Sequence, residues 1–219
     1  MKVVKMQLSE EVKALIDNLL LGAINEKLQM FSGLNKLAKP NQIVFVGDSI
    51  TEGFPIDELL VSQKQIYKRG ISGIEAIRVV KEYDRVLKGL CPSEVFILLG
   101  TNDIGKGRSI AETVTAIMDL CEALALETPN VKRHLLSLYP VIENANDMVG
   151  IRKNKTIVRI NQKLEAYSKT SESLYYHDIY SLLLDKESGQ LQTDFTQDGL
   201  HLTLKGYQKV CDYLQSYLL

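Results

Sequence analysis

Hydrophobic residues recur at helical spacing near the start of the chain. Residues 8–39 are therefore predicted to form an amphipathic helix, whose apolar stripe contains Val12, Leu15, Ile16, Leu19, Leu20, Ala23 and Ile24. Ser9 is the expected N-cap, Gly22 or Gly33 is a candidate break, and Pro40 helps to end the segment. We expect the stripe to be buried, because exposing it would leave a large apolar patch.

Beyond residue 41, short apolar runs alternate with amphipathic segments. Strands are predicted at 42–46, 66–69, 94–99, 132–138 and 174–179, and helices at 72–88, 109–127, 152–169 and 203–218. Two of these helices open with a capping-box pattern, Ser72-x-x-Glu75 and Ser109-x-x-Glu112, and residues 185–197 form the longest irregular stretch. The alternation predicts an α/β domain over 41–219, with a parallel sheet between two helical layers, preceded by a helical arm over 1–40.

Four short polar motifs fall after predicted strands or in loops. They are Gly47-Asp48-Ser49, Gly70 within Arg69-Gly70-Ile71-Ser72-Gly73, Gly100-Thr101-Asn102-Asp103, and Asp198-Gly199-Leu200-His201. Ligands of open parallel sheets bind outside the carboxyl ends of the strands. We therefore expect the four motifs to meet at that edge of the sheet.

Ser49 has two interpretations. It can cap a helix, since Ser49-Ile50-Thr51-Glu52 also fits the capping-box pattern. It can instead be a nucleophile whose own N–H, at the positive end of a helix, stabilises the negative charge that develops on an attacked carbonyl. A serine nucleophile requires a base.

Three histidines are candidates for that base. His134 and His177 lie in predicted strands, whereas His201 lies in a loop just before the last helix. Asp198, three residues before His201, can bind the imidazole nitrogen that faces away from the serine. The alternative is that Asp198 and His201 only form a turn and cap that helix.

Gly70 and Asn102 are candidate hydrogen-bond donors to the same negative charge. A glycine lets the backbone N–H approach a ligand closely, and a side-chain amide can add a further donor. Each also has a structural interpretation, since Gly70 suits a strand-to-helix turn and Gly-Thr-Asn-Asp favours turns. Asp48 and Asp103 are expected to organise their loops.

Composition narrows the class of protein. The 219 residues carry 26 basic and 27 acidic side chains, a net charge of −1, and the pI near 6.3 argues against nucleic acid as a partner. No apolar run is long enough to span a bilayer, and the first residues lack the features of a signal peptide, so we expect a cytoplasmic protein without an integral membrane segment. Cys91, Cys121 and Cys211 are interpreted as reduced packing residues, with no metal site.

Taken together, the four motifs resemble those of the SGNH hydrolases, also called the GDSL lipase/acylhydrolase family. The resemblance covers about 42–218 and is similar in layout to the α-type subunits of platelet-activating-factor acetylhydrolase. It implies a flavodoxin-like three-layer α/β/α sandwich with a five-stranded parallel sheet. It also implies a triad of Ser49, His201 and Asp198, and an oxyanion hole formed by Ser49, Gly70 and Asn102, without metal or cofactor.

The predicted function is hydrolysis of carboxylic esters with small acyl or acetyl groups through an acyl-enzyme. One alternative is a flavodoxin-like module that binds phosphate or another anion without hydrolase activity, although the chain lacks a P-loop. The other is a catalytically inactive interaction protein, against which the complete set of triad residues speaks. The expected partner is a small-molecule ester. A homodimer is also expected, with the arm packed on its own domain and contributing to the interface away from Ser49.

Overall fold

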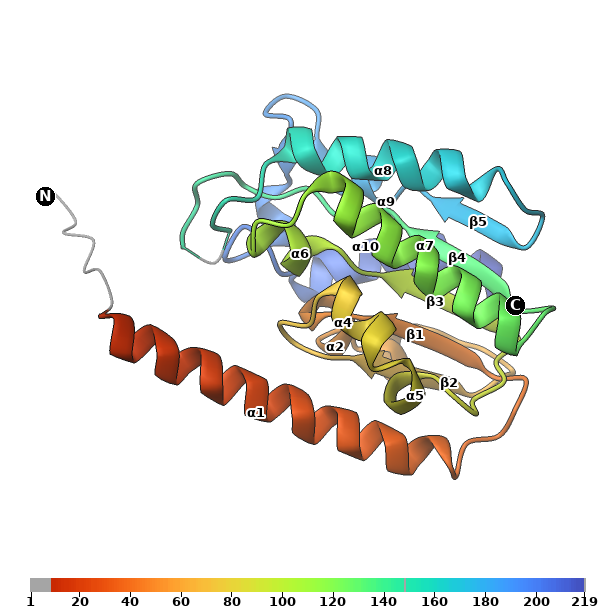
Figure 1. Cartoon of the computed structure of the whole chain (residues 1–219). Helices are drawn as coiled ribbons and strands as arrows, with labels where there is room; N and C mark the ends of the chain where they lie inside the picture. The colour runs from red at the N-terminus through yellow and green to blue at the C-terminus, as the bar shows by residue number, and fades with distance from the viewer. Residues whose placement is uncertain (1–8, 148, 219) are drawn as a thin grey trace, which may run out of the picture.

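The computed structural model describes residues 9–147 and 149–218. Five parallel strands form the central sheet: β1 (Ile43–Gly47), β2 (Ile66–Gly70), β3 (Glu94–Leu98), β4 (Lys132–Leu136) and β5 (Leu174–His177). Their spatial order is β2-β1-β3-β4-β5, the strand order of flavodoxin-like proteins. The five-stranded parallel sheet predicted from the sequence is confirmed (Figure 1).

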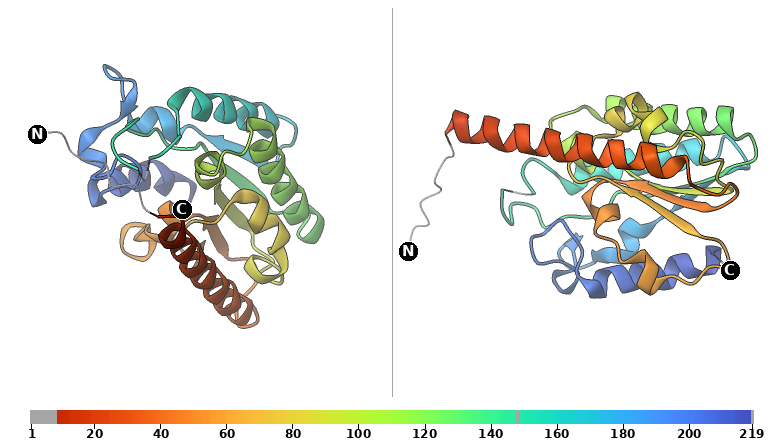
Figure 2. Two further views of the ribbon diagram at one scale, coloured as in Figure 1. Left: turned by 60° about the vertical axis from the view of Figure 1, so that its left-hand side comes forward. Right: turned by 90° about the horizontal axis from the view of Figure 1, so that it is seen from below.

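Helices cover both faces of the sheet, as Figures 1 and 2 show. One layer contains α4 (Ala76–Lys81), α5 (Tyr83–Val86), α7 (Ile110–Glu127) and α8 (Asn154–Ser168). The other contains α2 (Ser49–Glu52), α3 (Ile56–Leu59), α9 (Ile179–Leu183) and α10 (Leu204–Leu214). The short helix α6 (Thr101–Gly105) follows β3, and 3-10 turns occupy Thr193–Phe195 and Gln215–Tyr217.

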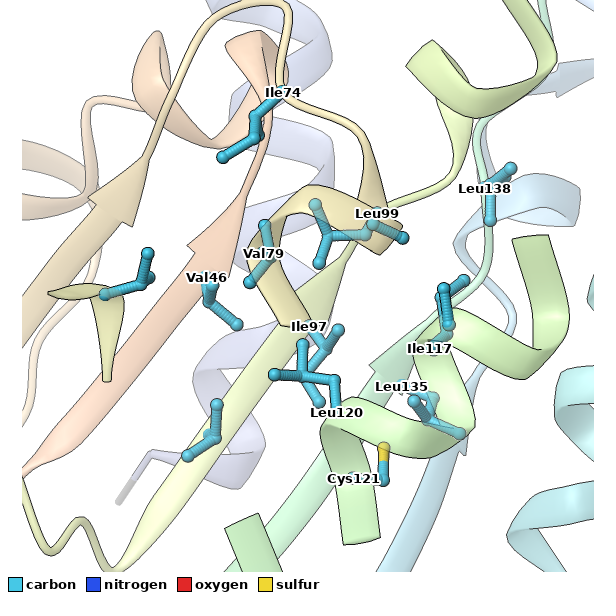
Figure 3. Packing of buried hydrophobic residues seen from close by; sticks show 14 of the residues in the cluster. Val46, Ile74, Val79, Ile97, Leu99, Ile117, Leu120, Cys121, Leu135 and Leu138 are labelled. Atoms are coloured by element: carbon cyan, nitrogen blue, oxygen red, sulfur yellow. The ribbon is translucent and has the colours of Figure 1, made fainter. Parts of the chain in front are cut away.

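Successive residues of the central strands are buried on opposite faces. In β3, Val95 and Ile97 pack toward α4 and α7, in the core drawn in Figure 3, whereas Phe96 and Leu98 pack toward α10. Residues of β3 are buried on both sides, as expected for a parallel strand between two helical layers. The apolar run that predicted this strand is therefore explained by burial on both faces.

The N-terminal helix α1 (Glu10–Asn35) begins where the sequence predicts, because the Ser9 side chain accepts the N–H of Val12 at 3.3 Å. Neither Gly22 nor Gly33 breaks it, and it ends five residues before Pro40. Residue 8, the expected start of the segment, lies outside the described residues.

Helix α1 packs on the domain only from about Leu20 onward, where Leu20 is partly buried against the core. Ile24, Leu28 and Phe31 are buried in the core beside α5. The turns before Leu20 extend beyond the domain, and four apolar side chains there are 41–66% exposed: Val12, Leu15, Ile16 and Leu19 (Figures 1 and 2). The expected packing of the arm on its own domain therefore holds for only part of the stripe, since the periodicity of a helix does not reveal where its neighbours end.

The helix predicted over 72–88 is replaced by a turn and the two short helices α4 and α5. The Ser72–Glu75 capping box does not form, because Ser72 binds Glu52 and Glu75 binds Lys106 and Arg108. The corresponding box at Ser109 and Glu112 does form and starts α7.

Smaller corrections concern the loops and cysteines. The stretch predicted to be irregular contains the antiparallel pair β6 (Leu184–Asp185) and β7 (Gln190–Leu191). All three cysteines are free; Cys121 and Cys211 are buried, but Cys91 is exposed and is not a packing residue. Among the described helices, none is long and apolar enough to cross a bilayer.

Candidate active site

Three candidate residues follow three neighbouring strands. In the sheet, β1 lies between β2 and β3, and Gly47 at its end is paired with Gly70 on one side and Leu98 on the other. Ser49 and Asn102 come two and four residues after the ends of β1 and β3. The parallel topology therefore brings Gly70, Ser49 and Asn102 to the same edge of the sheet.

Ser49 is the first residue of α2, and its hydroxyl points at His201. Asp48, not Ser49, caps this helix, since Asp48 Oδ1 accepts the N–H of Ile50 at 2.9 Å. Ser49 Oγ is left to bind His201 Nε2 at 2.9 Å. The capping interpretation of Ser49 is therefore wrong, since Asp48 caps α2 and the Ser49 hydroxyl contacts His201.

Asp48 is fully buried, and its Oδ2 has no hydrogen-bond partner within the described residues. Burial raises the pKa of this carboxyl to about 6, against the opposing effects of the Ile50 N–H and of the nearby His201 and Arg152. The expected role of Asp48 in organising the first loop agrees with its position as the cap of α2.

The other nitrogen of the His201 ring binds Asp198. His201 Nδ1 and Asp198 Oδ2 are 2.7 Å apart, and Asp198 Oδ1 accepts the N–H groups of Leu200 and His201 at 2.9 and 2.8 Å. Partial burial opposes ionisation of Asp198, but these hydrogen bonds outweigh it and lower the pKa of the carboxyl. An ionised Asp198 fixes the ring so that Nε2 faces Ser49 as a hydrogen-bond acceptor.

Gly70 lies directly against α2. A Cβ atom on Gly70 would come within 2.2 Å of Glu52 N and 2.6 Å of Glu52 Cα, so only glycine fits between the end of β2 and α2. On the other side of β1, Gly100 has a φ of 120°, a left-handed conformation that favours glycine. This conformation allows α6 to begin directly after β3.

The side-chain amide of Asn102 is held from both ends. Its Nδ2 donates to the carbonyl of Ile74 at 3.1 Å, and its Oδ1 accepts from Arg152 Nη2 at 3.2 Å. The buried Arg152 also donates from Nε to the carbonyl of Thr101 at 2.9 Å. Because a guanidinium only donates, it fixes the amide with Nδ2 on the side away from Arg152.

Comparisons with known proteins show the family to which the chain belongs. The model of the GDSL-like Lipase/Acylhydrolase family matches residues 45–209. The chain belongs to the GDSL-like lipase/acylhydrolase family. As a member of it, the protein is an SGNH-type esterase, and ester hydrolysis in general is its chemistry.

Three solved structures illustrate the likeness of this GDSL-like hydrolase to other proteins. One described as a candidate platelet activating factor from Streptococcus pneumonia is 31% identical, covers 97% of this chain and 100% of its own, and has a TM-score of 0.91. A candidate acylhydrolase from Bacteroides fragilis NCTC 9343 is 24% identical over 87% and 95%, with a TM-score of 0.77. A carbohydrate esterase family 3 protein from Talaromyces cellulolyticus is 18% identical over 81% and 96%, with a TM-score of 0.61. No curated protein matched the sequence.

The other two histidines of this GDSL-like hydrolase lie in strands of the sheet, as the sequence predicts. His134 and His177 lie in β4 and β5, are 3% and 1% exposed, and bind each other through Nδ1 and Nε2 at 2.9 Å. Burial lowers the pKa of His177 to about 4. Glu94 lies 3.3 Å from the His134 ring. Among the described residues, no cluster of three or more His, Cys, Asp or Glu side chains could hold a metal ion.

Sequence reasoning missed Arg152 and Glu52 in this hydrolase. Arg152 binds the Asn102 amide from a position 50 residues further along the chain, and Glu52 binds Ser72 across 20 residues. Neither belongs to one of the four motifs. Glu52 carried a signal only as the end of the Ser49-x-x-Glu52 pattern, where it was interpreted as part of a cap.

Proposed function

We propose that the protein hydrolyses small acyl or acetyl esters by nucleophilic catalysis with Ser49, His201 and Asp198. The observation that carries the proposal is the pair of short contacts through one imidazole, 2.9 Å to Ser49 Oγ and 2.7 Å to Asp198 Oδ2. This geometry suits a base that takes the serine proton while a carboxylate stabilises the resulting imidazolium.

In the proposed reaction, Ser49 Oγ attacks the ester carbonyl as its proton moves to His201 Nε2. The N–H groups of Ser49 and Gly70 and the second N–H of the Asn102 amide donate to the developing oxyanion. His201 then protonates the departing alkoxide, which leaves Ser49 acylated. Water, deprotonated by His201, attacks the acyl-enzyme and releases the acid.

We expect short acyl groups to be preferred. The chain has no tryptophan, and its sequence shows no long apolar helix beside the four motifs that would act as an interfacial lid. The similarity in fold to a carbohydrate esterase is the reason to include acetylated sugars among the substrates tested. In a panel of p-nitrophenyl esters run beside acetylated sugars, kcat/KM should be highest for the shortest chains.

An active-site serine probe and a chain-length series make this test decisive. A fluorophosphonate should label Ser49 of the wild-type protein, whereas the Ser49→Ala variant should remain unlabelled. Activity that rises steadily with chain length and increases sharply at micelle formation would contradict the preference for short groups. Failure of the wild type both to label and to hydrolyse any ester would overturn the proposed function.

We also propose a homodimer that covers the exposed turns of α1. Leu15 and Leu19 are 58% and 66% exposed on a helix that extends beyond the domain, and such patches mark association surfaces. Light scattering should show dimers of the full-length chain and mainly monomers of a Leu15→Glu/Leu19→Glu variant. Leu126→Glu, at a leucine that is 87% exposed elsewhere, should stay dimeric. A wild-type chain that remains monomeric at high concentration would exclude the dimer.

The predicted location of the protein is still the cytoplasm.

A further inference from the structure

A single carboxylate connects the helix of Ser49 to the turn after Gly70. Glu52 is the last residue of α2, and its Oε2 accepts both the backbone N–H and the hydroxyl of Ser72, each at 2.6 Å. Ser72 lies in the segment of residues 70–76, here called the Gly70 turn. Glu52 therefore joins the element that carries the candidate nucleophile to the element that carries a candidate oxyanion donor.

Packing makes this connection rigid. The backbone of Glu52 lies so close to Gly70 that a Cβ atom would not fit between them. The Gly70 turn is also tied to β1, since the Ile71 N–H donates to the carbonyl of Gly47 at 3.0 Å. A change at the Glu52 carboxylate is therefore transmitted to Gly70 without an intervening flexible segment.

The far end of the Gly70 turn is bound to the helix of Asn102. The Asn102 amide donates to the carbonyl of Ile74, and the N–H of Ala76 donates to Asp103 Oδ2 at 2.8 Å. The expected role of Asp103 in organising its loop thus extends to the neighbouring turn. Both candidate donors outside Ser49 depend on the position of the Gly70 turn.

Helix α1 provides the counter-ion of this carboxylate. Lys27 Nζ lies 2.9 Å from Glu52 Oε1, on the part of α1 that packs against the domain. Partial burial opposes ionisation of Glu52, but the hydrogen bonds from Ser72 and Lys27 outweigh it and lower the pKa of the carboxyl. Hydrogen bonds to a charged acceptor are stronger than those between neutral groups. An ionised Glu52 therefore holds Ser72 more firmly than a neutral side chain would.

We propose that Glu52 is a positioning residue of the oxyanion site, which holds the Gly70 turn against the nucleophile helix with Lys27 of α1 as its counter-ion. The inference rests on the proposed esterase function. It gives the N-terminal helix a role in the geometry of the active site, in addition to the proposed role in assembly away from Ser49.

The test is the Glu52→Gln variant of the full-length chain, with active sites counted by fluorophosphonate titration. Glutamine keeps the size of the side chain but removes its charge and places a donor where an acceptor is needed. We expect kcat to fall by about 10-fold with KM within about twofold, because oxyanion bonds strengthen mainly in the transition state. Glu165→Gln, which breaks the exposed 2.9 Å ion pair with Lys169, should keep wild-type kcat.

A double mutant distinguishes positioning from a general loss of structure. In the Glu52→Gln/Asn102→Ala double mutant, the fold-loss in kcat should be clearly smaller than the product of the fold-losses of the two single mutants. The reason is that both side chains act on the same oxyanion. Effects that multiply fully would overturn the inference. If Glu52→Gln does not fold, Ser72→Ala, which removes only the hydroxyl hydrogen bond, should lower kcat about threefold, and unchanged kcat would overturn the inference equally.

The same measurements separate this inference from the proposed function. Wild-type kcat in the titrated Glu52→Gln protein, beside an inactive Ser49→Ala protein, would overturn the inference and leave the esterase proposal intact. Full activity of Ser49→Ala would overturn both.

Discussion

Replacement of Ser49 by alanine is expected to lower kcat by at least about 10⁴-fold, and replacement of His201 by alanine should have a similar effect. The reason is the 2.9 Å contact between Ser49 Oγ and His201 Nε2, through which the hydroxyl loses its proton in the proposed reaction. Because the two residues act as a unit, the double mutant should be little worse than either single mutant. Steady-state hydrolysis of p-nitrophenyl acetate measures all three variants.

Thermal unfolding of each variant is the necessary control, since neither side chain is part of the apolar core. Ser188→Ala provides a matched serine variant, because Ser188 also donates a hydrogen bond, to the Asp185 carboxylate, at an exposed position away from the four motifs. It should keep wild-type turnover. Turnover close to wild type in Ser49→Ala would remove Ser49 from the mechanism.

The second large effect is expected at Asn102. Truncation of its amide in Asn102→Ala should lower kcat by roughly 10²–10³-fold with a smaller effect on KM, since a donor to the oxyanion bonds most strongly in the transition state. The fixed orientation of the amide, between the Ile74 carbonyl and the Arg152 guanidinium, is the basis for this expectation. Full Michaelis–Menten curves are required to separate the two parameters.

Asn25→Ala is the corresponding control, because Asn25 is an exposed residue of α1 that accepts a hydrogen bond from Arg78 at 2.8 Å. It should alter neither parameter by more than about twofold. If Asn102→Ala raised KM and left kcat unchanged, Asn102 would bind the substrate and would not be a donor to the transition state.

Local signals in the sequence were sufficient for much of the fold. The Ser9 cap and the Ser109–Glu112 box involve residues three positions apart, so their formation depends on few other contacts. The apolar run of β3 identified a strand buried on both faces. The motifs at Ser49 and His201 were identified as a pair because both residue types are needed for one chemistry.

The predictions that failed depended on distant partners. Ser72 and Glu75 fit a capping box as well as Ser109 and Glu112 do, but Glu52 and the cations Lys106 and Arg108 bind them instead. The exposed turns of α1 show the same limit, since a stripe of apolar residues indicates a face and does not reveal what covers it. A lone arginine such as Arg152 carries no local pattern at all.

The chain order of the candidate triad has a consequence for synthesis of the protein. Ser49 and its base are separated by 152 residues, and His201 lies between the last strand of the sheet and α10. A growing chain that has already made β1 to β5 therefore still lacks the group that activates its serine. On the proposed mechanism, the Ser49 hydroxyl therefore has no base until the segment that carries His201 has been made and has docked beside α2.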